Sequence, residues 1–150
     1  MIAIDVSEKW RNKDIRVTKI PEQGALLRNK WESYFAAHLS NQEKNEIHLL
    51  DQESCRGHLW HVFSYEKKDC LEGQKAEDAF NLEPKNTCYL FFQDADEVLL
   101  LENASMLSAA DFVHVTKKDM YIVDNQFRWT FVITHETGWL GPYFSRSENT

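Results

Sequence analysis

The segment between Asp119 and Phe144 constrains the fold of this chain more than any other part of the sequence. It contains two apolar runs, Met120–Val123 and Arg128–Thr134, which are separated by a short polar turn. In the second run every other side chain is Trp, Phe or Ile, and this period of two is typical of a strand whose two faces have different surroundings. The segment therefore predicts two neighbouring antiparallel strands.

The rest of the chain alternates between strand-like and helix-like stretches, and only three Pro and five Gly interrupt it. This order predicts an α+β protein, a single domain over residues 1–150, in which a mostly antiparallel sheet of about five to six strands packs against one long and one or two shorter helices. Residues 1–12 are expected to be weakly ordered. The remaining expected elements are a strand at Asp14–Ile20, the long helix from Pro21 to Leu39, a loop or short helix at Asn41–Asp51, a strand at His58–Tyr65, a helix at Gln74–Leu82, a hairpin of Thr87–Gln93 and Val98–Leu101 with an acidic tip, and a helical turn near Ser108.

The net charge of −7 is unevenly distributed, because residues up to Trp31 carry seven Lys and Arg against four Asp and Glu. The remainder of the chain is strongly acidic and would repel a phosphate backbone, so nucleic-acid binding is not expected as the main function. An acidic surface complements a basic protein partner, although it equally serves to keep an aromatic-rich protein in solution.

No stretch of the sequence approaches the roughly 20 apolar residues of a membrane helix, and the first residues lack the pattern of a signal peptide. Three cysteines, Cys55, Cys70 and Cys88, form no disulfide framework, which is typical of reduced thiols. We therefore expect a cytoplasmic protein without a membrane partner. A homodimer remains possible.

His135 and Glu136 are the strongest candidates for a functional site, because they directly follow the long apolar strand and precede a Thr-Gly break. In this hypothesis His135 is a base or hydrogen-bonding anchor, Glu136 or Asp124 polarises it, and Tyr143 is a nearby donor. In the alternative interpretation, His135 continues the buried face of the strand and Glu136 is solvated.

Other reactive side chains form weaker patterns. Cys55, His58 and His61 have metal-like spacing, but a zinc site needs about four ligands, and the expected strand would separate the two histidines. The acidic tip at Asp94–Glu97 lacks the glycine and the distal acid of a calcium loop. A nucleophilic site would need Cys88 or Cys70 near His114 or His135, and no nucleophile motif is present. We expect neither a metal nor another cofactor.

Several aromatic stretches of the chain resemble those of a known family. These stretches are Trp60–Tyr65, Phe91–Gln93, Trp129–Glu136 and Gly141–Phe144. They resemble small bacterial proteins catalogued as domain-of-unknown-function family 4275, over most of the chain from about Leu26 onward. The resemblance implies a single-domain bacterial cytoplasmic protein and no particular activity. Its recognisable positions are Trp60, Trp129, His135, Glu136 and Tyr143.

Two hypotheses about function follow from these observations. The first is a non-enzymatic protein-binding domain, similar to an inhibitor or immunity protein, which acidity and aromatic richness favour. The second is a small enzyme or ligand-binding domain with a pocket around His135, Glu136 and Tyr143. The absence of catalytic motifs favours the first. A binding domain should show exposed aromatic side chains on an acidic surface, whereas an enzyme should enclose His135 and Glu136 in one pocket.

Overall fold

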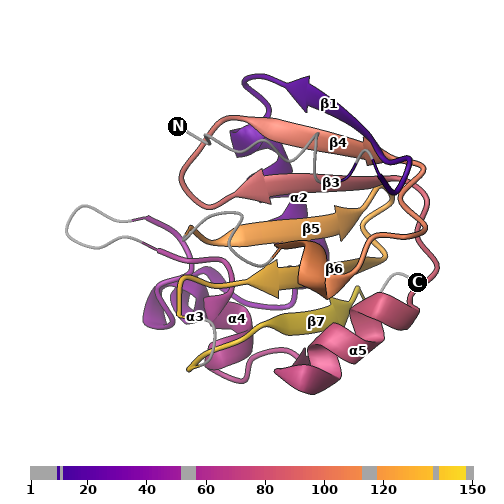
Figure 1. The fold of residues 1–150 in the computed structure, drawn as a ribbon. Helices are drawn as coiled ribbons and strands as arrows, with labels where there is room; N and C mark the ends of the chain where they lie inside the picture. The colour runs from indigo at the N-terminus through magenta and orange to yellow at the C-terminus, as the bar shows by residue number, and fades with distance from the viewer. Residues whose placement is uncertain (1–9, 11, 52–56, 113–117, 137–138, 148–150) are drawn as a thin grey trace.

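The computed structural model describes residues 10, 12–51, 57–112, 118–136 and 139–147. Within them, seven antiparallel strands form one sheet with the order β1-β4-β3-β5-β6-β7-β2 (Figure 1). The strands are β1 (Arg16–Ile20), β2 (Leu71–Glu72), β3 (Cys88–Phe92), β4 (Val98–Glu102), β5 (Met120–Asp124), β6 (Trp129–Ile133) and β7 (Tyr143–Arg146). The helices are α2 (Gly24–Phe35), α3 (Asn41–Glu46), α4 (His61–Ser64), α5 (Gln74–Leu82) and the 3₁₀ turn η1 (Ala109–Phe112).

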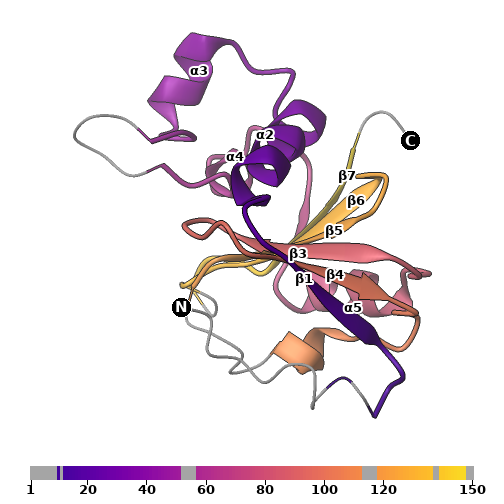
Figure 2. The ribbon, with the colours of Figure 1, turned by 90° about the horizontal axis from the view of Figure 1, so that it is seen from above.

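The sheet lies between two layers, with α2, α3 and α4 on one side and α5 with η1 on the other (Figure 2). Alternation along β6 explains how both faces become apolar. Phe131 points to the α5 side, where its ring stacks on Phe80 at 4.4 Å between centroids. Val132 belongs to the core on the opposite face, together with Trp31 of α2. The sheet therefore has a hydrophobic core on each face.

The α+β class and the antiparallel sheet are confirmed. The pairing of β5 with β6 matches the expected strand pair, with Ile122 opposite Phe131. The helix α5 has the predicted bounds, and β3 and β4 form the predicted hairpin. At the helical turn predicted near Ser108, the 3₁₀ turn η1, the backbone N–H of Ser108 donates to Asp111 Oδ2 at 2.8 Å.

Three expectations are corrected. The sheet has seven strands rather than five to six, because β2 and β7 add a further pair at one edge. The long helix begins at Gly24 and ends at Phe35, inside the expected Pro21–Leu39 range. His58–Tyr65 contains helix α4 rather than a strand, since the buried side chains of Val62 and Phe63 pack together against the α2 side of the sheet.

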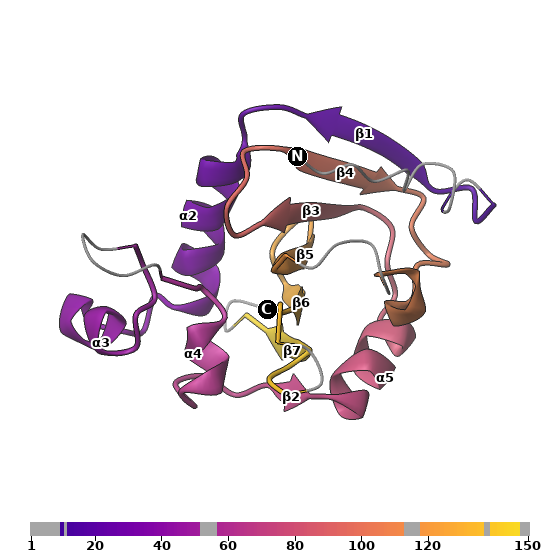
Figure 3. The same cartoon turned by 60° about the vertical axis from the view of Figure 1, so that its left-hand side comes forward.

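The expectation of weak order over residues 1–12 falls almost entirely outside the described residues. Among the residues that are described, no helix is long and apolar enough to cross a membrane. Figure 3 shows α2 and, below it, α4 along one face of the sheet, with β5 and β6 beside them. The candidate site lies where these elements meet.

Candidate functional site

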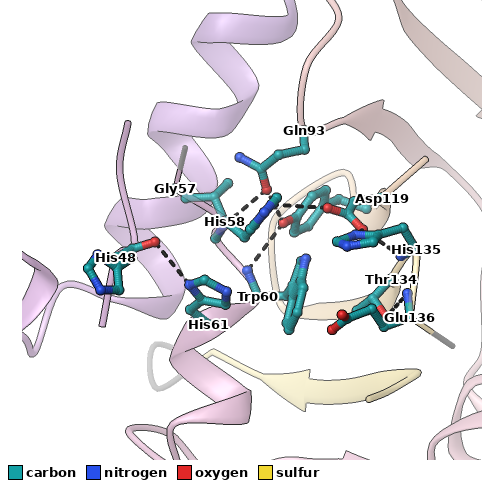
Figure 4. Close-up of polar contacts among 12 residues, drawn as sticks. His48, Gly57, His58, Trp60, His61, Gln93, Asp119, Thr134, His135 and Glu136 are labelled. Carbon is teal, nitrogen blue, oxygen red and sulfur yellow. Dashed lines mark hydrogen bonds and ion pairs between the residues drawn. The ribbon is translucent and has the colours of Figure 1, made fainter. Parts of the chain in front are cut away.

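Asp119 is the centre of the candidate site (Figure 4). It directly precedes β5, and only 4 % of the residue is exposed. Its Oδ1 accepts hydrogen bonds from the backbone N–H of His135 at 2.6 Å and from Nδ1 of the same residue at 2.8 Å. Its Oδ2 lies 3.2 Å from Nδ1 of His58, an ion-pair contact that falls outside hydrogen-bond angles. One buried carboxylate thus contacts two imidazole rings.

The two histidines come from distant parts of the chain. His135 follows the end of β6, and the pairing of Met120 with Ile133 places this end beside the start of β5. His58 lies shortly before α4, and its backbone N–H donates to the carbonyl of His48 at 3.0 Å. His48 has a left-handed backbone with φ 53°, which lets the chain turn after α3 and present that carbonyl. The site therefore joins the helical layer to the sheet.

Burial raises the pKa of Asp119, but its contacts with His58, Trp60 and His135 outweigh burial and lower the pKa to about 2. The contact with Asp119 raises the pKa of His58 above its ordinary value, against the opposing effect of burial. Asp119 is therefore ionised at neutral pH, and its charge favours the protonated form of His58.

Trp60 forms a wall of the site. It is 2 % exposed, and its ring centroid lies 5.4 Å from that of His58, 4.7 Å from that of His61 and 6.0 Å from that of His135. Its indole N–H is buried without a well-formed hydrogen bond among the described residues. Three imidazoles thus surround one buried indole.

A second layer of hydrogen bonds supports this arrangement. The hydroxyl of Tyr121 donates to Oε1 of Gln93, which also accepts from the backbone N–H of Leu59 at 3.0 Å. The backbone N–H of Trp60 donates to the Tyr121 hydroxyl at 3.2 Å. Burial raises the pKa of Tyr121 well above its ordinary value, so this hydroxyl remains a donor. The chain preceding α4 is therefore fixed to β5 and to the end of β3.

A groove of about 310 Å³ adjoins this layer, because Leu59 and Gln93 also line it. Its other walls come from α2, from the loop after α3 and from the β3–β4 loop. Among its lining residues are Asp51 and Asp94, whose charges help to raise the pKa of His58. The surroundings of the site are thus acidic.

The structure brings together some of the residues that the sequence singled out. His135 and Trp60 belong to the cluster. Glu136 is exposed, with its backbone N–H donating to Thr134 Oγ1 at 3.1 Å. Tyr143 is buried and packs against Phe63, at 5.4 Å between ring centroids, and burial raises the pKa of its hydroxyl. The ring of Tyr143 also stacks on that of Trp60, at 6.4 Å between centroids, so the structure groups Trp60, His135 and Tyr143 and leaves Glu136 exposed.

The expected role of Asp124 as a carboxylate that polarises His135 is corrected. It lies at the other end of β5, opposite Cys88, and its carboxylate binds Arg128 through Nε at 2.7 Å and Nη2 at 3.1 Å. Asp119, rather than Asp124 or Glu136, is the carboxylate that contacts His135.

The sequence did not point to Asp119, and it singled out His58 and His61 only for their metal-like spacing with Cys55. A signal for Asp119 was present, because the register of the β5–β6 hairpin places it beside the residues that follow Ile133. Of the suggested metal ligands, Cys55 lies outside the described residues. Within the described part of the chain, no group of three or more His, Cys, Asp or Glu is arranged to hold a metal ion.

Burial raises the pKa of the half-buried Cys70 thiol to about 11 and that of the buried Cys88 thiol to about 12. Such thiols carry little of the reactive thiolate at neutral pH. His114, the other partner suggested for a nucleophilic pair, lies outside the described residues.

Comparison with known proteins gives one match. The model of the family described as Domain of unknown function (DUF4275) matches residues 4–144. No curated protein and no solved structure matches the chain. The resemblance noted in the sequence is thereby confirmed.

Proposed function

We propose a function from the geometry of this site, because the chain belongs to the DUF4275 family, whose description assigns none. The proposal is that the protein binds a small molecule at the Asp119 cluster and performs acid–base chemistry on it. One observation carries it: a single buried carboxylate contacts Nδ1 of both His58 and His135.

The chemistry follows from which ring atoms are occupied. A carboxylate in contact with Nδ1 fixes the orientation of an imidazole and stabilises its protonated form. Because Nδ1 of each ring faces Asp119, Nε2 of each ring is directed away from it. Nε2 is then the atom that gives or takes a proton.

The exposure of the three side chains supports this reading. The Asp119 side chain is 3 % exposed, whereas that of His58 is 21 % exposed and that of His135 is 44 % exposed. The orienting group is thus enclosed, and the rings that it orients are open to a ligand.

The test is histidine NMR spectroscopy with sets of small carboxylates, phosphate esters, amines and sugars. We expect at least one set to shift the imidazole resonances of His58 and His135 in the wild-type protein. The same compounds should give no response in His135→Gln and an unchanged response in His38→Gln. His38 is a suitable control because its Nε2 contacts the carbonyl of Lys67, away from the cluster. If no set shifts either resonance, the proposal is wrong.

A second candidate function, recognition of a basic protein, is supported by Trp139. This side chain is 85 % exposed and lies three residues after Glu136, in a chain of net charge −7. Exposed Trp side chains are frequent energetic centres of interfaces. In this second proposal the protein is a non-enzymatic, cytoplasmic binding domain.

Affinity capture from host lysate tests the second candidate. The Trp139→Ala variant should lose a partner that the wild type captures, and Leu82→Ala should retain it. Leu82 is a matched control because it is also a large apolar side chain that is highly exposed, 83 %, at the end of α5. Capture that Trp139→Ala leaves unchanged contradicts this candidate.

A further inference from the structure

His61 is the third imidazole of the cluster, and Asp119 makes no hydrogen bond to it. Its Nδ1 lies 2.8 Å from the carbonyl oxygen of Ile47 and 3.0 Å from that of His48. A carbonyl oxygen only accepts hydrogen bonds, so Nδ1 must carry the proton. In the neutral ring, Nε2 of His61 therefore holds a lone pair.

His58 has the opposite environment although the two rings are neighbours. Their centroids are 5.1 Å apart, and the rings are nearly perpendicular, at 75°. The carbonyl of His48 fixes both residues, because it accepts from the backbone N–H of His58 and faces Nδ1 of His61. The partner of the His58 ring, however, is the carboxylate of Asp119. One ring is thus held by an anion and the other by neutral acceptors.

We infer that His58 and His61 form a proton-transfer pair, in which His58 donates a proton to the substrate and His61 accepts one from it. This inference rests on the proposed acid–base function. In the transfer, Nε2 of His61 removes a proton from the substrate, whose bonding electrons stay on the atom that lost it. Nε2 of His58 gives its proton to a second atom of the same substrate. His58 ends neutral and His61 ends charged, and exchange with water restores both.

The protonation preferences of the two rings agree with these roles. Burial lowers the pKa of His61, and the neighbouring charge of His58 lowers it further, against the opposing effect of the two carbonyls. The pKa of His58 is instead raised by its contact with Asp119. Titratable groups with environments that separate their pKa values in this manner are the usual arrangement of an acid and a base in one site.

The charges around the pair indicate the class of substrate. His58 contacts Asp119 at the start of β5 and lies beside the rings of His61 and His135, while the charges of Asp94 in the β3–β4 loop and Asp51 after α3 also act on it. The three carboxylates disfavour an anionic molecule. The substrate is therefore a neutral or cationic small molecule with an exchangeable proton.

The test uses the full-length, ligand-free protein. Long-range ¹⁵N–¹H NMR spectroscopy at about pH 6 should show His58 protonated and His61 neutral, with its proton on Nδ1. Carbethoxylation with diethyl pyrocarbonate, followed by mass spectrometry of peptides, then reports whether the unprotonated nitrogen is accessible. Comparison of each rate at about pH 6 and about pH 8 cancels the difference in exposure between the rings.

We expect the labelling rate of His58 to fall at least about threefold more than that of His61 on going to the lower pH, because a larger share of the His58 rings is then protonated. In Asp119→Asn this contrast should disappear. The inference is overturned if His61 is protonated at about pH 6, if it resists labelling at both pH values, or if the two rates fall equally. Its failure is distinct from that of the proposed function, which the small-molecule NMR experiment decides independently of the state of His61.

Discussion

Replacement of Asp119 by Asn is the perturbation that tests the site most directly. Asn preserves the volume and one acceptor oxygen, but it removes the charge that His58 and His135 contact. The pKa of Asp119 is lowered from 3.8 to about 2. Since each unit of pKa corresponds to about 1.4 kcal/mol, the ionised carboxylate stabilises the folded state by about 2 kcal/mol.

The pH dependence has a definite sign. Because the folded pKa of Asp119 is depressed, its contribution is present above about pH 4 and decreases as the pH falls toward 2. Because the pKa of His58 is raised above 6.5, the contribution of its protonated form is present below that value and is lost as the pH rises through the folded pKa. Both shifts describe one ion pair and are not additive. The free energy of unfolding of the wild type should therefore exceed that of Asp119→Asn by the largest amount at about pH 5.5.

Urea unfolding measures this difference. With a denaturant slope of about 2 kcal/mol/M, the midpoint of Asp119→Asn should lie about 1 M below that of the wild type at about pH 5.5. The difference should decrease to about half near pH 3. Asp124→Asn is the matched control: it also removes a buried carboxylate from an end of β5, but it should leave the imidazole resonances unchanged. A difference below about 0.5 kcal/mol at about pH 5.5, or one that is independent of pH, would refute the reasoning.

Three further predictions concern single side chains. The NMR titration midpoint of His58 should lie above 6.5 in the wild type and fall in Asp119→Asn, because burial alone lowers its pKa; an unchanged midpoint would exclude the ion pair. Lys85→Met should lower the free energy of unfolding by about 1–3 kcal/mol in urea, since the buried ammonium donates to two main-chain carbonyls at the end of α5; a neutral effect would show that water replaces it. Thr130→Val should cost about 1–3 kcal/mol in the same assay, because it leaves the buried indole N–H of Trp31, now 2.9 Å from Thr130 Oγ1, without an acceptor; stability equal to the wild type would contradict this.

The β5–β6 pair was predictable from sequence because its information is local. Alternation places Trp129 and Phe131 on one face, and a short turn fixes the register between neighbouring strands. Residues His58–Tyr65 carry no such local signal. Leu59, Trp60, Val62 and Phe63 are all buried, and so short an apolar run fits a strand or a helical turn equally well. Packing against α2 and the sheet, rather than local propensity, decides its conformation.

In the candidate site too, the residues identified from sequence are those whose signal is local. His135 was identified because it directly follows a strong strand, and that feature is visible in one stretch of sequence. Its partner was predicted to be Glu136 or Asp124, which are closer to it along the chain, but Glu136 is exposed and the carboxylate of Asp124 binds Arg128 within the same turn. Counting the hairpin register back from Ile133 would have favoured Asp119. The contribution of His58 depends on how the helical layer docks on the sheet, and no local pattern specifies that.

Asp119 links stability and reactivity, and this linkage determines which variants are informative. Its carboxylate is enclosed and holds two layers together, so any change there alters folding as well as chemistry. The ring of His135 lies on the open side of the same contact, with 44 % of its side chain exposed. His135→Gln therefore removes the imidazole while sacrificing little buried surface, and exposed ion pairs contribute only about 0–1 kcal/mol to stability. If that variant unfolds as the wild type does and loses its response to a ligand, the imidazole acts on that ligand and is not merely part of the fold.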